Sequence, residues 1–446
     1  MSKKTFKGGI HPLYFKELSK ASPIRRLNPP SEVAIPLIQH TGAPCLPKVN
    51  KGDEVKAGTC IGESDKFISS PIHSSLSGKV KTIKRVPHPV LGSCDAVVIE
   101  SDGKDEKESS LNGSLKDAEQ LSADEIIRFV KDAGIVGLGG AAFPTHVKLK
   151  PPAEKSIDTF ILNGAECEPY LTCDERVMIE KPDEVIKGAV LMMKALGLKR
   201  GIIAIEDNKP EAIKAIRKAL NDIRHAKCDM RTVVLHTKYP QGGEKQLIKA
   251  LLNREVPHGG LPFDVGCIVD NIQTAYAVYE AIYQGKPLYE RVITVTGDAV
   301  SNPSNLLVRI GTPLSYIIDN CGGFKSDPSK IIMGGPMMGL AQFSNDTPVI
   351  KGTSGVLILS EKQARQRMSQ YCIRCGKCIE ACPLNLVPTD IARAAEYENF
   401  DMANELYAKD CMECGACAYS CPSNIELVQL IKHAKNILLR RERKDV

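Results

Sequence analysis

The sequence predicts a multidomain α/β protein in four parts: a β-rich N-terminal domain, a three-layer α/β domain, a small strand-rich module and a helical, cysteine-rich domain. Three observations support this fold class. Proline and glycine separate short apolar runs within residues 31–100. From about residue 124, strand patterns alternate with helix patterns. Eight of the 16 cysteines fall between Cys372 and Cys421. A chain of 446 residues is long enough for several such domains.

The composition excludes several classes of protein. Hydrophobic residues make up 43% of the chain and charged residues 25%, as in ordinary globular proteins, which excludes global disorder. A formal net charge of +6 is too small to indicate a nucleic-acid partner. No apolar run approaches the roughly 18 residues that a spanning helix needs, and the first residues lack an apolar secretory segment. We therefore expect no transmembrane segment and no signal peptide.

The first domain is expected over residues 1–100. Its brief apolar runs, such as Val97-Val98-Ile99, predict short strands in a small all-β domain. Residues 101–123 are polar and nearly free of large apolar side chains, so they cannot bury much surface. This predicts a solvated linker.

The α/β domain is expected over residues 124–289. Strand patterns at 157–162, 201–205 and 232–235 alternate with helix patterns at 182–196, 210–221 and 273–283. This alternation predicts a largely parallel sheet between layers of helices. In residues 290–358 strand patterns predominate again, with one short helix, which predicts a small α+β module. Residues 359–446 form the cysteine-rich domain with a basic tail.

The cysteine-rich domain carries the same run twice, Cys-x2-Cys-x2-Cys-x3-Cys-Pro. This spacing is typical of [4Fe–4S] clusters, and in two-cluster proteins the fourth cysteine of each run binds the other cluster. The alternative is a pair of structural zinc sites, but zinc usually takes separated Cys-x2-Cys pairs. We assign cluster 1 to Cys372, Cys375, Cys378 and Cys421, and cluster 2 to Cys382, Cys411, Cys414 and Cys417.

Four polar segments lie where the α/β pattern predicts loops next to strands: the glycine-rich turn 137–145 followed by Lys148, and segments 163–170, 239–244 and 270–274. Open α/β sheets bind ligands at the carboxyl ends of their strands, and glycine-rich turns leave amide groups free for phosphate. Each segment alone also fits an ordinary loop or helix cap. Together they indicate one binding site.

At this point the sequence resembles a known family, the RnfC family of the Rnf electron-transport complex, along almost its whole length. The resemblance rests on Gly8-Gly9-Ile10-His11-Pro12, on Ile35-Pro36-Leu37 with Gln39-His40, on the glycine turn and on the doubled cysteine runs. The central domain is also similar to the NADH- and FMN-binding subunit of respiratory complex I. The resemblance implies a barrel-sandwich hybrid of the biotinyl/lipoyl type for the first domain. It implies a β-grasp (SLBB-like) module for residues 290–358.

The same resemblance implies an FMN site and a nucleotide site. Phe143 would stack on the nicotinamide nucleotide, and Glu168 and Glu244 would lie near it. The sequence departs from the complex I motifs at Leu138, at Gly243-Glu244 and at Asp270-Asn271, and we expect FMN binding to survive these changes. The residues implied for FMN are Gly137, Gly139, Gly140, Lys148, Asn163, Glu166, Tyr239, Gly242, Asn271 and Thr274.

We therefore expect a peripheral flavin–iron–sulfur oxidoreductase that exchanges hydride between NAD(H) and FMN and relays single electrons through the two clusters. By resemblance, its partners are membrane-bound Rnf subunits, including a ferredoxin-like iron–sulfur subunit, at the cytoplasmic face of the cell membrane. Two alternatives stay open: a cobalamin reductase of the propanediol-utilisation type, which shares this domain order and cofactors, and an electron relay that has lost its nucleotide site.

Three further features favour ordinary structural roles. Lys66 lies in a turn similar to that of lipoyl domains, but its spacing to Gly78 is one residue too long, so we expect an unmodified surface lysine. Cys167 and Cys173 flank the 163–170 segment and are expected to be buried thiols rather than a redox pair. The basic tail fits a solvated helix end.

Overall fold

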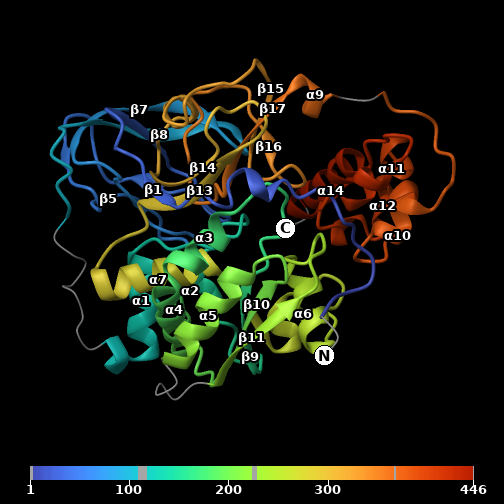
Figure 1. Cartoon of the computed structure of the whole chain (residues 1–446), viewed down its shortest axis with the longest axis horizontal. Helices are drawn as coiled ribbons and strands as arrows, with labels where there is room; N and C mark the ends of the chain where they lie inside the picture. Colours follow the sequence, from blue (N-terminus) through green and yellow to red (C-terminus); the bar gives the residue numbers. More distant parts are fainter. Residues whose placement is uncertain (1–3, 109–117, 223–228, 366–367, 445–446) are drawn as a thin grey trace.

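The computed structural model describes residues 4–108, 118–222, 229–365 and 368–444. Figure 1 shows the β-rich domain and the strand-rich module above the α/β domain, with the cysteine-rich domain to one side. Residues 109–117 of the predicted linker, Cys228 and the last two residues of the tail lie outside the described residues. The linker residues just before them, 102–108, are exposed, and Ala57 pairs with Glu106 and Glu108 through backbone hydrogen bonds.

The β-rich domain consists of two antiparallel sheets. The four-stranded sheet runs in the order β2-β8-β7-β4 and the three-stranded one in the order β3-β5-β6. Alternate residues such as Val33, Ile35, Ile61 and Ile72 are buried in its core, as expected for strands with one face inward. The strands are β2 (Glu32–Pro36), β3 (Leu46–Pro47), β4 (Glu54–Val55), β5 (Cys60–Glu63), β6 (Ile72–His73), β7 (Gly78–His88) and β8 (Gly92–Ser101).

The α/β domain has a four-stranded parallel sheet in the order β11-β10-β9-β12. Both faces of its strands are buried: Phe160 and Leu162 pack with the helices of one layer, and Ile161 packs with the opposite layer of α6. The strands are β9 (Thr159–Gly164), β10 (Arg200–Glu206), β11 (Asp229–Leu235) and β12 (Cys267–Asn271). The helices are α1 (Ala123–Asp132), α2 (Thr145–Lys148), α3 (Cys173–Glu180), α4 (Pro182–Ala195), α5 (Pro210–Asp222), α6 (Glu244–Leu252) and α7 (Ile272–Gln284), and a short 3-10 helix, η3 (Pro262–Val265), precedes β12.

The strand order places a topological switch point between β9 and β12. The chain leaves β9 toward β10 on one side, whereas β12 joins the sheet on the other side. Asn163, one residue before the end of β9, and Asn271, the last residue of β12, are register partners. Such a crevice at the carboxyl ends of parallel strands is where open α/β sheets bind ligands.

The strand-rich module is a six-stranded sheet in the order β1-β14-β13-β17-β15-β16. Its central pair, β13 and β17, is parallel, and helix α8 covers its buried core. The edge strand β1 (Ile24–Arg26) comes from the N-terminal segment and pairs with β14 in parallel, so this segment extends the module rather than the β-rich domain. The other elements are β13 (Glu290–Thr296), β14 (Ser304–Arg309), α8 (Leu314–Asp319), β15 (Pro328–Met333), β16 (Leu340–Ala341) and β17 (Gly355–Ser360).

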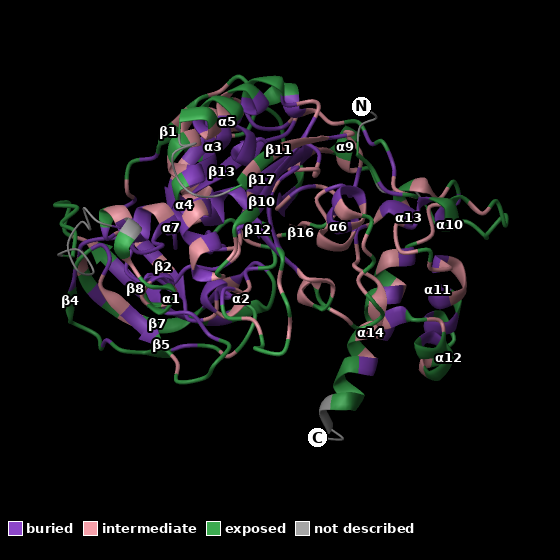
Figure 2. Cartoon of the chain, turned by 90° about the horizontal axis from the view of Figure 1, so that it is seen from below, coloured by how far each residue is buried: buried purple, intermediate pink, exposed green. Residues whose placement is uncertain are grey.

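The cysteine-rich domain is helical, as the sequence predicts. Its long C-terminal helix packs on α11, around buried Ile391, Leu427 and Ile431. Figure 2 shows this domain as a lobe beside the deeply buried strands of the two large sheets. No helix among the described residues is both long enough and apolar enough to cross a bilayer. The helices are α9 (Glu361–Ala364), α10 (Lys377–Ala381), α11 (Pro388–Glu396), α12 (Phe400–Glu405), α13 (Ala416–Ser420) and α14 (Leu427–Lys444).

Candidate functional site

A cavity of about 600 Å³ opens at the switch point of the α/β sheet, and all four parts of the chain contribute to its walls. His40 and His88 come from the β-rich domain, Gly335 and Ser354 from the strand-rich module, and Met412 from the cysteine-rich domain. Eight of the residues predicted for the cofactor site line it: Gly139, Gly140, Asn163, Glu166, Glu168, Tyr239, Gly242 and Asn271.

The glycine turn offers unpaired amide groups to this cavity. Among the described residues, no acceptor is found for the N–H groups of Gly139, Gly140 and Ala141. By contrast, the carbonyl of Ala141 has a hydrogen-bond donor, because Thr41 Oγ1 donates to it at 2.9 Å. A Cβ atom at Gly139 would stand 3.4 Å from Asn271. Gly140 has a left-handed φ of 113°, which favours glycine, and a turn with free amides fits the phosphate of a flavin nucleotide.

The two asparagines at the strand ends hold the neighbouring segments together. Asn163 Nδ2 donates to the carbonyl of Gly242 at 2.8 Å. Asn271 caps α7 by accepting from Gln273 N, and its Nδ2 donates to Asp174 Oδ2 at 2.7 Å. The predicted segments 163–170, 239–244 and 270–274 therefore meet at one place.

Two glutamates of the 163–170 segment are fixed by backbone amides. The Glu166 carboxylate accepts from the amides of Asp174 and Glu175 at 2.7 and 3.2 Å, at the first turn of α3. The Glu168 carboxylate accepts from the amides of Met337 and Met338 at 3.1 and 2.9 Å. Burial raises the pKa of Glu168 to about 7 despite these bonds. Burial, and then the Glu166 carboxylate, raises the pKa of Asp174 to about 6.

Five predicted residues do not line the cavity. Lys148 Nζ donates to Glu244 Oε1 at 2.7 Å and to the carbonyl of Val269 at 2.6 Å, so these two charges satisfy each other. Thr274 Oγ1 accepts from the amide of Leu138 and braces the glycine turn from behind. The carbonyl of Phe143 accepts from the amide of Gly137 within the turn. The predicted contacts of Gly137, Phe143, Lys148, Glu244 and Thr274 with a nucleotide stay predictions.

The two cysteine runs have the same backbone shape. Arg374 and Glu413 occupy equivalent positions and have left-handed φ values of 55° and 59°. The amide of Arg374 lies 3.4 Å from Cys372 Sγ, and the amide of Glu413 lies 3.4 Å from Cys411 Sγ. Such N–H···S contacts are typical of the loops that wrap iron–sulfur clusters.

Among the described residues, the sulfurs of the two runs are not gathered as closely as the ligands of one zinc ion. No three of the described cysteine sulfurs lie within 4.8 Å of one another, whereas thiolates around one zinc ion would be about 3.8 Å apart at Zn–S bonds of about 2.3 Å. Burial, followed by the nearby thiols Cys411 and Cys382, raises the pKa of Cys417 and Cys414. Cys382, from the first run, thus lies near cysteines of the second run, and the assignment of the individual cluster ligands stays a prediction.

The second cysteine run is joined to the cavity. The hydroxyl of Tyr239, which lines the cavity, donates to the carbonyl of Cys414 at 2.7 Å. Met412, between Cys411 and Cys414, also lines the cavity. By contrast, Cys372 and Cys375 of the first run are exposed to solvent. The second cysteine run therefore contacts the cavity, whereas two cysteines of the first run face solvent.

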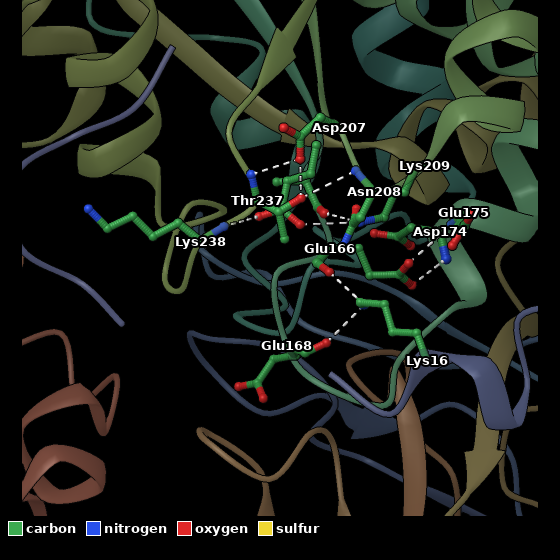
Figure 3. A network of polar contacts seen from close by, with 12 residues as sticks. Lys16, Glu166, Glu168, Asp174, Glu175, Asp207, Asn208, Lys209, Thr237 and Lys238 are labelled. Atoms are coloured by element: carbon green, nitrogen blue, oxygen red, sulfur yellow. Dashed lines mark hydrogen bonds and ion pairs between the residues drawn. The ribbon is translucent and has the colours of Figure 1, made fainter. Parts of the chain in front are cut away.

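Sequence reasoning missed a set of buried cations around the cavity. Lys16 and Lys209 donate to backbone carbonyls of the 163–170 segment, and Lys209 Nζ reaches the carbonyl of Ala165 at 2.6 Å (Figure 3). Arg291 Nη2 donates to the carbonyl of Leu138 at 3.2 Å, so a cation reaches the glycine turn from the strand-rich module. Lys351 donates to two backbone carbonyls, and its burial lowers its pKa to about 8. Lysine and arginine side chains are usually exposed, so the sequence gives no indication that these ones are buried.

The features for which the sequence favours structural roles have ordinary surroundings. Lys66 is exposed in a turn. Cys173 is buried, with its Sγ 3.3 Å from the carbonyl of Ser354, and Cys167 is half-buried at the cavity wall. On the tail helix α14, Lys435 and Arg441 form ion pairs with Glu413 and Asp401.

Comparison with known proteins identifies all four parts. Residues 4–104 match the model of the RnfC barrel sandwich hybrid domain and residues 130–280 that of the Nuo51 FMN-binding domain. Residues 292–341 match the SLBB domain and residues 364–424 a 4Fe-4S dicluster domain. These matches confirm the predicted fold class and the expected cofactors, FMN and two [4Fe–4S] clusters.

Relatives cover nearly the whole chain. It is 49% identical to the C subunit of the Na(+)-translocating ferredoxin:NAD(+) oxidoreductase complex of Acetobacterium woodii, over 99% of this chain and 98% of the relative. It is 48% identical to the proton-translocating counterpart of Clostridium ljungdahlii, over 91% and 87%. The C subunit of the ion-translocating oxidoreductase complex of Rhodobacter capsulatus is 40% identical, over 98% and 84%. In the fold, a chain of an NAD+-reducing [NiFe]-hydrogenase matches with a TM-score of 0.53 at 17% identity, over 72% of this chain and 67% of that one.

Proposed function

Since the chain belongs to the RnfC family, the C subunits of ion-translocating ferredoxin:NAD(+) oxidoreductase complexes, we propose that it exchanges hydride between NAD(H) and FMN and relays single electrons through two [4Fe–4S] clusters. One observation carries the proposal: Tyr239 of the cavity is hydrogen-bonded to Cys414 of the cluster 2 ligands. FMN supplies the chemistry that a hydride-to-electron converter needs, because it accepts electrons in pairs and releases them singly.

The residues of the cavity bind and orient the flavin nucleotide. We assign its phosphate to the free amides of Gly139, Gly140 and Ala141, because these donors have no acceptor among the described residues. Asn163 and Asn271 fix the floor of the site at the two strand ends. His40 and His88 close it from the β-rich domain and limit the access of water.

The ligand sets define the order of the relay. Cluster 2, on Cys382, Cys411, Cys414 and Cys417, would lie next to the flavin site, because Met412 of its loop lines the cavity. Cluster 1, on Cys372, Cys375, Cys378 and Cys421, would lie at the outer end, because Cys372 and Cys375 are exposed. No protein acid or base is needed for hydride transfer itself, so the residues named here bind and position.

The family places the chain in a membrane-associated complex of several subunits. We propose that the exposed end of the cluster 1 ligands, flanked by exposed Arg374 and Lys377, faces a ferredoxin-like iron–sulfur subunit of that complex. Partner and chain would then meet at the cytoplasmic face of the cell membrane.

Anaerobic titration of the reconstituted protein with NADH tests the proposal. The protein is loaded with iron, sulfide and FMN, and the flavin and cluster absorbances are followed separately. We expect NADH to bleach the flavin and then the clusters. A flavin that only dithionite reduces would contradict the hydride step and leave a relay without nucleotide activity. Two zinc ions and no sulfide per chain would contradict the cluster assignment.

A further inference from the structure

The N-terminal strap, defined as residues 4–20, crosses three parts of the molecule before the β-rich domain begins. Its start pairs with the α/β domain, where Lys4 bridges to Leu235 and Ile10 to Tyr239. Figure 1 shows this strap passing between the cysteine-rich domain and the α/β domain. It contains the Gly8-Gly9-Ile10-His11-Pro12 motif, to which the cofactor chemistry gives no role.

Gly8 of this motif makes close backbone contact with Cys382, a predicted cluster 2 ligand, and Gly9 pairs with the residue before Cys382. The amide of Gly9 donates to the carbonyl of Ala381 at 2.9 Å, next to Cys382. A Cβ atom at Gly8 would stand 2.7 Å from the carbonyl oxygen of Cys382, and Gly8 has a φ of +80°. Both the contact and the left-handed backbone favour glycine here.

The other end of the strap holds the flavin loop, defined as residues 166–171. Lys16 is 6% exposed, and its ammonium group donates to the backbone carbonyls of Glu166, Glu168 and Leu171 at 2.8, 3.0 and 2.5 Å. Figure 3 shows its Nζ directed at the first two carbonyls. Three bonds use all the protons of the ammonium group, which is how a buried lysine is satisfied.

The flavin loop needs such a tie because its backbone is strained. Glu166 and Tyr170 have left-handed φ values of 45° and 69° without being glycine. The strap adds two further contacts to the same loop. The amide of Tyr170 donates to the carbonyl of Tyr14 at 2.7 Å, and the rings of Phe15 and Tyr170 stack at 4.8 Å.

We propose that Lys16 is a positioning residue of the flavin site: it holds the flavin loop in the shape that lines the cavity, and the strap ties that loop to the cluster 2 ligands. The inference rests on the proposed FMN site and adds to it a determinant 150 residues away along the chain. The strap joins Lys16 to Gly8 directly, so one short segment sets how the flavin wall and the Cys382 end of cluster 2 lie relative to each other.

Binding of FMN to flavin-free, cluster-loaded full-length protein tests the proposal, with the quenching of FMN fluorescence as the signal. Lys16→Met removes all three donors and is expected to raise the Kd for FMN by about tenfold to hundredfold. Lys7→Met, an exposed residue of the same strap, is the matched control and should change the Kd by less than about twofold. Cluster absorbance and the thermal midpoint without FMN report whether the fold is intact.

A folded Lys16→Met protein that binds FMN like the wild type would overturn the proposal. If wild-type protein itself does not bind FMN, the proposed function fails instead. If Lys16→Met does not fold, Lys16→Gln replaces it, since an amide can donate to two of the three carbonyls and should weaken binding by an intermediate factor.

Hydrogen exchange on the wild-type protein gives a second test that needs no variant. Because coupling between sites is reciprocal, a strap that stabilises the FMN-binding loop must itself be stabilised by FMN. We expect FMN to slow the exchange of amides in residues 14–20, and unchanged exchange there in FMN-saturated protein would overturn the proposal.

Discussion

The hydrogen bond from Tyr239 to Cys414 can be removed with little change of shape. Tyr239 is 1% exposed, and its hydroxyl lies 2.7 Å from the carbonyl oxygen. Tyr239→Phe keeps the ring but leaves a buried carbonyl without this donor, which costs about 1–3 kcal/mol. For a cooperative unit of roughly 150–250 residues, a loss of 1 kcal/mol lowers the unfolding midpoint by about 2–4 °C.

The same substitution should separate the two halves of the reaction. The flavin site keeps its amides and asparagines, so NADH should reduce FMN at the wild-type rate in Tyr239→Phe. Reduction of the clusters should slow, because the bond between cavity and cluster 2 loop is lost. Stopped-flow absorbance measures both rates. Tyr397→Phe, which removes a hydroxyl from a side chain that is 77% exposed, is the control. An unchanged midpoint together with unchanged cluster reduction would refute the reasoning.

Three further predictions follow from the cavity and its surroundings. Cys382→Ser should halve the iron and sulfide content and prevent NADH from reducing the remaining cluster. Cys372→Ser should also halve the iron content, but NADH should still reduce the remaining cluster. Metal analysis measures the first effect and absorbance the second. Because the pKa of Glu168 is raised to about 7, FMN affinity should fall as the pH rises through 7 and the carboxylate ionises beside an anionic ligand. Fluorescence titration in Glu168→Gln should show no such step. The pKa of Lys351 is lowered to about 8, so above that pH Lys351 holds its proton only in the unfolded chain, and its contribution to stability should rise between about pH 8 and 10.5. Denaturant unfolding of Lys351→Met should lack this rise.

The sequence was most informative where the chemistry is local. The four cysteines of each run lie within eleven residues, so their spacing alone indicates a cluster loop, and the repeated left-handed residues Arg374 and Glu413 are consequences of that spacing. The alternation of strands and helices was equally readable, because parallel strands buried on both faces leave long apolar runs, such as Phe160-Ile161-Leu162.

The sequence was least informative about the N-terminal segment. Its strand β1 is short, with two of three side chains exposed, and it joins a sheet whose next strand lies about 280 residues later. An edge strand of this kind is held by backbone hydrogen bonds, which every sequence offers, so no periodicity identifies it. Lys107 of the predicted polar linker forms the same kind of backbone pairing with Ala57.

The buried cations were unpredictable for a related reason, and together they explain how the cavity can bind an anionic cofactor. Among the described residues that line it, none is Lys or Arg, whereas Glu166, Glu168 and Asp174 are acidic. Lys16 and Arg291 instead donate to backbone carbonyls one layer behind the walls. Every residue has a backbone carbonyl, so the sequence does not show which carbonyls bind a cation. The positive charge of the bound cation still acts on the cavity, because the protein interior screens charge poorly. The cations thus offset the carboxylates without occupying the space of the ligand.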